Sequence, residues 1–395
     1  MSRRVLVAGV GMVPFAKPSA AKTYDELGAG AVRAVLDDAG LAYERIQQVY
    51  AGYVYGDSTC GQRVVYRFGK TRVPVINVNN NCASGSSALW LARQAVESGA
   101  VDCALAVGFE QMPPGALSAK WQDRPLPLTD FISALKNVYD VDPGLPMTPQ
   151  YFAAAGVEYM AKYGMAAETF AQVSVKARTH AANNPYAVFR DPITLDDVLA
   201  GPVVAGPLTR LQCCPPTCGA AAAIVCSEDY ARAHGLDPKV AIAAQTLQSD
   251  AADLFDKRSA MSLVGSDVTR AAAREVYEKA GVDPRDIKVV ELHDCFTVNE
   301  VLTYEGLGLC EEGGAEKFIL DGDNTYGGRV VTNPSGGLLS KGHPLGATGL
   351  AQTAEITWQL RGEAGPRQVE GATLGLQHNL GLGTAGVVTL FEKVG

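Results

Sequence analysis

The feature that most constrains the fold of this chain is an internal repeat. Residues 31–53 read as a helix, an Ala-Gly stop, a polar link and a strand, and residues 272–295 repeat this order. Gly40 and Gly281 follow the two helices. Glycine is favoured there because it readily adopts the positive φ of a helix C-cap. The repeat predicts two copies of one α/β unit.

The correspondence extends further along both halves. The helix expected after Cys82 corresponds to a helix over residues 346–360 in the second half, and the strand at 104–108 corresponds to one at 373–376. The sequence therefore predicts an α/β protein made of two similar halves, each a sheet covered by helices. Ligands of such folds bind at the carboxyl ends of the strands.

A long insertion interrupts the first half. Residues 116–203 are rich in proline and aromatics, include an expected helix at 167–182, and are predicted to form a lid over the active site because long insertions are usually functional. The predicted domains are an N-terminal half at 1–115 and 204–240, this inserted loop domain, and a C-terminal half at 241–395.

Composition excludes several function classes. The 395 residues are 47% hydrophobic and 19% charged, and the net charge is -8 without a clustered Lys/Arg stripe, which argues against nucleic acid as a partner. No apolar run approaches the roughly 18 residues of a membrane span. The basic and then apolar start, residues 1–10, is better explained as a buried strand than as a secretion signal.

Nine cysteines at irregular spacing indicate a reducing compartment rather than a disulfide framework. The run Cys213-Cys214-Pro215-Pro216-Thr217-Cys218 lacks a second ligand pair at useful spacing. No metal site is therefore predicted.

Cys82 is the candidate nucleophile. Residues 76–89 read as a strand, a polar turn and the start of a helix that continues to about Ser98. The helix N-terminus offers unpaired N–H groups and a positive dipole, which favour the thiolate and can hold an oxyanion. The alternative is that Cys82 is a small buried residue, the usual fate of a free cysteine.

Four more reactive side chains fall near expected strand ends or helix starts: His293, Cys295, His343 and His378. His343 lies in a Gly-rich loop before a helix and can act as the base for Cys82, or it can cap the loop. Cys295 can serve as a second acid/base opposite the nucleophile, or it can be a core residue.

His378 lies in a second polar, Gly-rich loop at 377–383 and is a further candidate catalytic residue, although a loop histidine that only forms hydrogen bonds is a serious alternative. His180 and His234 lie in polar, helix-like stretches and are predicted to be surface residues.

Together these motifs identify the chain as similar to a known family. The most specific are Asn79-Asn80-Asn81-Cys82-Ala83-Ser84-Gly85, His293-Asp294-Cys295-Phe296, Gly342-His343-Pro344 and Gln377-His378-Asn379-Leu380-Gly381. Over essentially its whole length the chain resembles the thiolase superfamily, within it the sterol carrier protein X type of 3-ketoacyl-CoA thiolase.

The resemblance implies a thiolase fold: two mixed five-stranded sheets in an α-β-α-β-α arrangement, an inserted loop domain, and a homodimer or dimer of dimers. The chain departs from commoner thiolases in two coupled ways. Their C-terminal Cys-x-Gly cysteine is missing near His378, and the His293-Asp294-Cys295-Phe296 run replaces their Asn-Glu-Ala-His or Asn-Glu-Ala-Phe loop. The second thiol is therefore expected at Cys295.

The implied activity is thiolytic cleavage of 3-ketoacyl-CoA through a Cys82 acyl-enzyme, in fatty acid or sterol side-chain metabolism. Coenzyme A is then a substrate, and no tightly bound cofactor is expected. His343 is the implied base and Cys295 the second acid/base. His293 and His343 serve one oxyanion. The backbone N–H of Cys82 and one from the 378–383 loop serve another, with Gly381 as a tentative donor.

Three alternatives stay open: Claisen condensation, retro-aldol cleavage of sterol side-chain CoA esters, and non-catalytic binding of acyl-CoA or lipid. Related aldolases lack the nucleophilic cysteine, so Cys82 counts against the second. The chain ends at Gly395 without a sterol-carrier domain or a Ser-Lys-Leu ending, which predicts a stand-alone enzyme of the bacterial cytoplasm.

Overall fold

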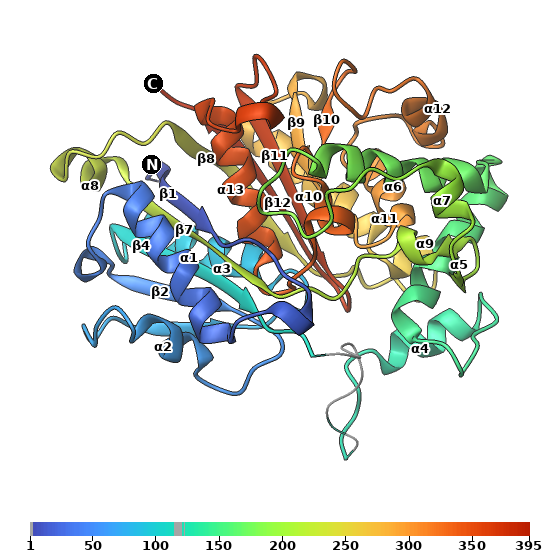
Figure 1. Ribbon diagram of the computed structural model, residues 1–395, viewed down its shortest axis with the longest axis horizontal. Helices are drawn as coiled ribbons and strands as arrows, with labels where there is room; N and C mark the ends of the chain where they lie inside the picture. The colour runs from blue at the N-terminus through green and yellow to red at the C-terminus, as the bar shows by residue number, and fades with distance from the viewer. Residues whose placement is uncertain (1–2, 114–120, 122) are drawn as a thin grey trace.

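The computed structural model describes residues 3–113, 121 and 123–395 (Figure 1). The N-terminal half comprises β1 (Val5–Met12), α1 (Tyr24–Ala39), β2 (Gln48–Gly52), α2 (Cys60–Val65), β3 (Val75–Val78), α3 (Ser84–Glu97), β4 (Cys103–Glu110), β7 (Gly219–Ser227) and α8 (Glu228–Ala233). The C-terminal half comprises β8 (Val240–Gln248), α9 (Ala260–Leu263), α10 (Ser266–Ala280), β9 (Val289–Glu291), α11 (Thr297–Gly306), α12 (Ala315–Leu320), β10 (Val331–Thr332), α13 (Thr348–Arg361), β11 (Leu374–Gly381) and β12 (Ala385–Lys393).

The two halves have the same sheet topology. The strand order is β3-β2-β4-β7-β1 in the first and β10-β9-β11-β12-β8 in the second. In each half the first three strands of this order run parallel and the remaining contacts are antiparallel. The predicted repeat and the mixed five-stranded sheets are thus confirmed. The edge strands β1 and β8 also pair antiparallel, at Leu6 and Ala241, so the two five-stranded sheets join into one ten-stranded sheet.

A helical layer lies between the sheets, as Figure 1 shows for α3 and α13. These helices carry buried Leu89 and Leu350, which share one apolar cluster with Val7 of β1 and Phe391 of β12. The helices α1 and α10 pack against the other faces of the two sheets. One face of each five-stranded sheet is buried against this helical layer. The loops at the edge of the layer therefore pack against residues of both halves.

The insertion contains α4 (Thr129–Lys136), α5 (Met147–Tyr163), α6 (Ala167–Ala181), α7 (Leu195–Leu199) and a short hairpin of β5 (Val203–Ala205) and β6 (Leu208–Thr209). Its predicted start at 116–120 and residue 122 lie outside the described residues. The aromatic rings of Phe152 in α5 and Phe296 stack with centroids 4.5 Å apart. The insertion helices therefore share the core of the C-terminal half.

Among the described residues, no helix combines the length and apolar character needed to cross a membrane.

Candidate active site

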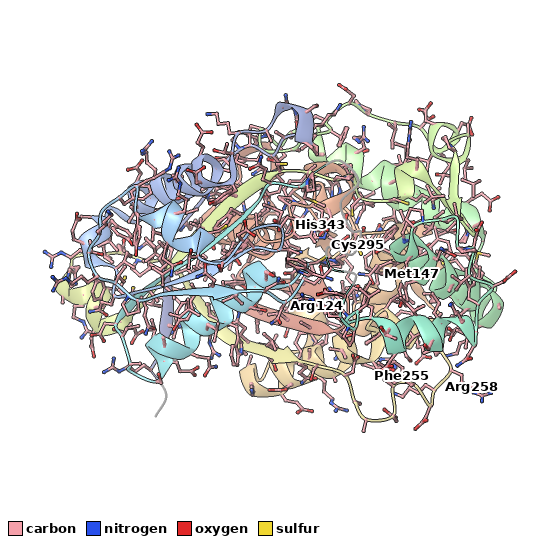
Figure 2. All side chains as sticks on the ribbon, turned by 90° about the horizontal axis from the view of Figure 1, so that it is seen from below. Arg124, Met147, Phe255, Arg258, Cys295 and His343 are labelled. Atoms are coloured by element: carbon pink, nitrogen blue, oxygen red, sulfur yellow. The ribbon has the colours of Figure 1, made fainter. Side chains whose placement is uncertain are left out.

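Cys82, His293 and His343 meet where the two halves join. Cys82 follows β3 and precedes α3, His293 follows β9, and His343 precedes α13. The Cys82 sulfur and one ring nitrogen of each histidine all lie within 4.8 Å of one another. Figure 2 shows His343 and Cys295 in the middle of the molecule, away from its outline. Three predicted site residues are thus brought together, although Cys82 is more than two hundred positions from either histidine in the chain.

A tight turn presents the Cys82 thiol. Asn81 adopts φ 51°, a left-handed conformation that asparagine tolerates better than most residues. The next amides are already used, because Ala83 N–H donates to the Asn80 carbonyl at 3.0 Å and Ser84 N–H donates to the Asn81 carbonyl at 3.1 Å. Few amides of the helix start are therefore free to stabilise a thiolate.

The prediction that Cys82 has a lowered pKa is wrong for this resting state. Burial raises the pKa of the Cys82 thiol to about 12, and the carboxyl of Glu110 adds to the effect. Hydrogen bonds from the N–H groups of Cys82 and Leu382 oppose this rise but do not overcome it. Cys82 therefore rests as a thiol, and the predicted role as nucleophile requires that it lose its proton.

His343 has one ring nitrogen in a hydrogen bond and the other without a partner among the described residues. Its Nδ1 lies 2.7 Å from the Thr348 hydroxyl, which in turn donates to the Pro344 carbonyl at 3.0 Å. The hydroxyl hydrogen is used there, so Nδ1 carries the ring proton and donates to Thr348. The other nitrogen, Nε2, is buried without a hydrogen-bond partner among the described residues. Burial lowers the pKa of His343 to about 3, so the ring is a neutral base.

His293 faces His343 almost at right angles. The ring centroids are 5.1 Å apart with an interplanar angle of 84°. Burial, with smaller effects from His343 and His378, holds the pKa of His293 well below its usual value. Its Nδ1 lies 2.9 Å from the side-chain nitrogen of Asn379. Both histidines are therefore neutral at physiological pH.

A buried ion pair ties the two histidine loops together. Lys341 Nζ lies 3.3 Å from the Glu291 carboxylate, and both side chains are fully enclosed. Each is two residues before its histidine in the chain. Ser335 supports the pair, since its N–H and hydroxyl donate to Glu291 at 3.0 and 2.8 Å. Satisfied buried charges fix geometry, because separating them leaves one uncompensated.

Cys295 is buried, and a second thiol lies opposite it. Cys213 pairs antiparallel with Phe296, and Cys214 N–H donates to the Cys295 carbonyl at 2.9 Å. Burial raises the pKa of Cys295 well above its usual value, and Cys214 and Cys82 add to the rise. The three thiols therefore share one region. Sequence reasoning did not assign Cys214 to the site, because nothing in its local run indicates a partner eighty residues away.

The role of Gly381 as an oxyanion donor stays a prediction. The loop N–H that reaches the Cys82 thiol belongs to Leu382, one residue further along. Gly381 instead allows close packing, because a Cβ there would lie 2.2 Å from the Asn80 carbonyl oxygen. Gly381 thus shapes the site through its missing side chain.

The three remaining histidines lie outside the cluster of Cys82, His293 and His343. His378 is buried behind His293, with Nε2 3.0 Å from the Thr269 hydroxyl and Nδ1 3.4 Å from the His293 N–H. These contacts favour a supporting role, and its catalytic role stays a prediction. His180 is not at the surface but buried against the Asn333 carbonyl at 3.0 Å. His234 is exposed, as expected.

Cys82, His293 and His343 also form the single cluster, within the described ranges, of three or more side chains that could ligate a metal. The same donor set suits proton transfer around a thiol. The expectation of no metal site stays a prediction.

Two family descriptions match the chain. "Thiolase, N-terminal domain" matches residues 5–229, and "Thiolase C-terminal domain-like" matches residues 252–392. Among curated relatives, "Sterol carrier protein 2" of Gallus gallus is 54% identical over 394 residues, covering 99% of this chain and 72% of that protein.

Solved structures show the same fold over the whole chain. The "Ltp2-ChsH2(DUF35) aldolase" has a TM-score of 0.84 at 25% identity and covers 99% of this chain and 98% of its own. Human mitochondrial 3-ketoacyl-CoA thiolase in complex with CoA has a TM-score of 0.74 at 20% identity, over 100% and 98% of the two chains. The second likeness concerns the fold alone. With both halves matched, the chain belongs to the thiolase family.

Proposed function

We propose that the protein cleaves 3-ketoacyl-CoA with coenzyme A, through an acyl-enzyme on Cys82. One observation carries the proposal: the half-buried thiol of Cys82 and a neutral imidazole whose second nitrogen has no partner among the described residues lie within 4.8 Å of each other. Members of the thiolase family are acyltransferases, and a nucleophile beside a general base is what acyl transfer requires.

The first half-reaction forms the acyl-enzyme. His343 Nε2 takes the Cys82 proton as the sulfur attacks the 3-keto carbon. The bond between C2 and C3 then breaks, its electron pair passes to C2, and the Cys295 thiol protonates this fragment to release acetyl-CoA or propionyl-CoA. The acyl group stays on Cys82. A buried thiol with a raised pKa rests protonated, which suits an acid toward a strongly basic enolate.

The second half-reaction reverses the proton transfers. The Cys295 thiolate takes the proton of incoming coenzyme A, whose sulfur attacks the acyl carbonyl. The tetrahedral oxygen is held by the Cys82 and Leu382 N–H groups. The intermediate expels Cys82, which regains its proton from His343, and the shortened acyl-CoA leaves. The same steps run backward give Claisen condensation.

The finer features of the function are part of this proposal. They are a 3-ketoacyl-CoA that can carry a 2-methyl branch or a steroid side chain, a homodimer or dimer of dimers, and the bacterial cytoplasm as the location. Coenzyme A acts as substrate, and no tightly bound cofactor takes part.

Retro-aldol cleavage of a sterol side-chain CoA ester is the second candidate, because the aldolase structure matches this chain with a TM-score of 0.84. A retro-aldol step needs an acid and a base but no acyl-enzyme, so it consumes no coenzyme A.

The variant Cys82→Ala distinguishes thiolysis from retro-aldol cleavage. Thiolysis of a 3-ketoacyl-CoA panel should be abolished in this variant while the protein stays folded, since one small side chain is lost. Cys226→Ala, a buried cysteine of β7 outside the site, is the matched control and should retain activity. Full coenzyme A-dependent cleavage by Cys82→Ala would refute the covalent mechanism. Cleavage of a 3-hydroxyacyl-CoA without coenzyme A would favour the aldolase.

A further inference from the structure

A series of hydrogen bonds between buried side chains connects the backbone of α13 to His293. Gln377 Nε2 donates to the Gly349 carbonyl at 3.0 Å and to the Ser86 hydroxyl at 2.6 Å. Ser86 donates to Asn379 Oδ1 at 2.8 Å, and Asn379 Nδ2 lies 2.9 Å from His293 Nδ1. The side chains of Gln377, Ser86 and Asn379 are fully buried.

The Gly349 carbonyl sets the donor and the acceptor of every hydrogen bond in this series. A carbonyl oxygen can only accept, so the Gln377 atom facing Gly349 is the amide nitrogen, which also donates to Ser86. Ser86 accepts that bond and gives its own hydrogen to Asn379 Oδ1. The other end of the Asn379 amide is then its NH₂ group, which can only donate.

His293 Nδ1 must therefore accept, and a neutral imidazole that accepts at Nδ1 carries its proton at Nε2. This is the opposite arrangement to His343, whose Nδ1 donates to Thr348 and whose Nε2 is bare. Two neutral histidines beside one thiol thus present a donor and an acceptor.

We propose that Asn379 is a positioning residue that fixes the His293 proton on Nε2, so that His293 donates to the substrate thioester oxygen while His343 accepts the Cys82 proton. The inference rests on the proposed function for its catalytic meaning. The tautomer itself is a property of the resting protein and holds without it.

Close packing keeps the amide from turning over. A Cβ at Gly349 would lie 2.0 Å from Ser86 Oγ and 2.8 Å from Asn379 Oδ1, so glycine is needed where α3 and α13 meet this series of hydrogen bonds. Rotating Asn379 by half a turn would aim its NH₂ at Ser86, which already accepts from Gln377. The Ser86 hydrogen would then lose its acceptor, at a real cost for a buried group.

The first test reads the tautomer in the resting protein by ¹⁵N NMR after labelling the histidines. The chain has five histidines, so His293→Gln identifies the His293 signals by their loss. A protonated Nε2 and a bare Nδ1 are expected for His293. A protonated Nδ1 in the wild type would overturn the proposal. In Asn379→Asp, whose carboxylate accepts from Nδ1, a protonated Nδ1 is expected, and an unchanged spectrum would also overturn it.

The second test measures kcat and KM for thiolysis. Asn379→Ala should lower kcat by about 10²–10³-fold, the loss typical of one oxyanion donor, with KM little changed. Asn324→Ala is the matched control, since Asn324 is a buried amide that donates to the Tyr304 hydroxyl at 3.0 Å, away from Cys82. A wild-type kcat in Asn379→Ala, or an equal loss in Asn324→Ala, would contradict a positioning role.

Ser86→Ala gives a third reading if Asn379→Ala does not fold. It leaves both amides in place but breaks the link between them, so a mixture of His293 tautomers and a smaller fall in kcat are expected. A single, unchanged His293 tautomer would contradict the proposal that the hydrogen bonds through Ser86 orient Asn379. Failure of thiolysis in the wild type would refute the proposed function alone, because the NMR result needs no substrate.

Discussion

At the scale of single residues, the chemistry of the site depends on neighbours that set proton positions rather than on charged catalytic groups. Cys82, His293 and His343 are all neutral at rest, because burial raises the pKa of the thiol and lowers that of both rings. Proton transfer must then occur within the enclosed site when substrate arrives. Thr348 and Asn379 decide which ring nitrogen takes part.

The protonation of Cys82 can be measured directly. Since the pKa of its thiol is raised to about 12, almost no thiolate should exist between pH 6 and about 9. The difference in ultraviolet thiolate absorbance between wild type and Cys82→Ala, followed against pH, should stay flat over that range. Half-titration near pH 7 would show that the helix N-terminus outweighs burial.

The second acid/base can be separated from His378 by substitution. Cys295→Ala should still allow a reactive thioester to acylate Cys82, yet kcat should fall by about 10²–10⁴-fold, as expected for loss of a general acid/base. His378→Ala should be milder, because its ring bonds to Thr269 and the His293 backbone.

The thiol of Cys214 allows a test that could contradict the role of Cys295 as the second acid/base. A near-normal Cys295→Ala with an inactive Cys214→Ala would assign the proton transfer to Cys214, and an inactive His378→Ala would assign it to the imidazole. Trapped acyl-enzyme and kcat, measured together for the three variants, decide among them.

At the scale of elements, a buried ion pair anchors the insertion to the C-terminal half. Lys176 of α6 bonds to Glu300 of α11, and the exposed fractions of the two side chains are 8% and 0%. The Tyr304 hydroxyl and Thr332 complete the network around them. Such a pair holds α6 in place, although its net contribution to stability need not be large.

Breaking that pair should be costly. Lys176→Met leaves Glu300 buried without its partner and should lower the free energy of unfolding by about 3–5 kcal/mol. Urea unfolding measures this. The double variant Lys176→Met/Glu300→Gln removes both charges and should recover much of the loss. An equal loss in both variants would show that packing, not charge, anchors α6.

At the scale of the whole molecule, the two halves share one core. Helix α13 of the second half contacts strands of the first, and its Arg361 bonds to Asp38 of α1 at 2.8 Å. Neither sheet can keep its inner face buried without the helices between them. The candidate active site lies at this junction, so a folded site requires both halves.

Unfolding should therefore be a single transition. Trp90 lies in α3 and Trp358 in α13, so tryptophan fluorescence reports mainly the shared layer, whereas far-ultraviolet circular dichroism reports all helices and strands. The two probes should give coincident midpoints in urea. A fluorescence change that precedes or follows the dichroism change would show that the halves unfold separately.

From the sequence alone we could predict the repeat, several of its helices and strands, and most of the residues that could react. These are local properties: the period of apolar residues, a glycine after each helix, and short motifs such as Gly342-His343-Pro344 can be read within a few positions.

The behaviour of those residues depends on contacts that form only in the folded protein. The pKa of Cys82 depends on burial and Glu110, the loop N–H that bonds to its thiol belongs to Leu382 rather than Gly381, and His180 is enclosed by a loop far along the chain. Cys214 meets Cys295 across eighty residues. Desolvation and hydrogen-bond direction arise from groups distant in sequence, so no local pattern can specify them.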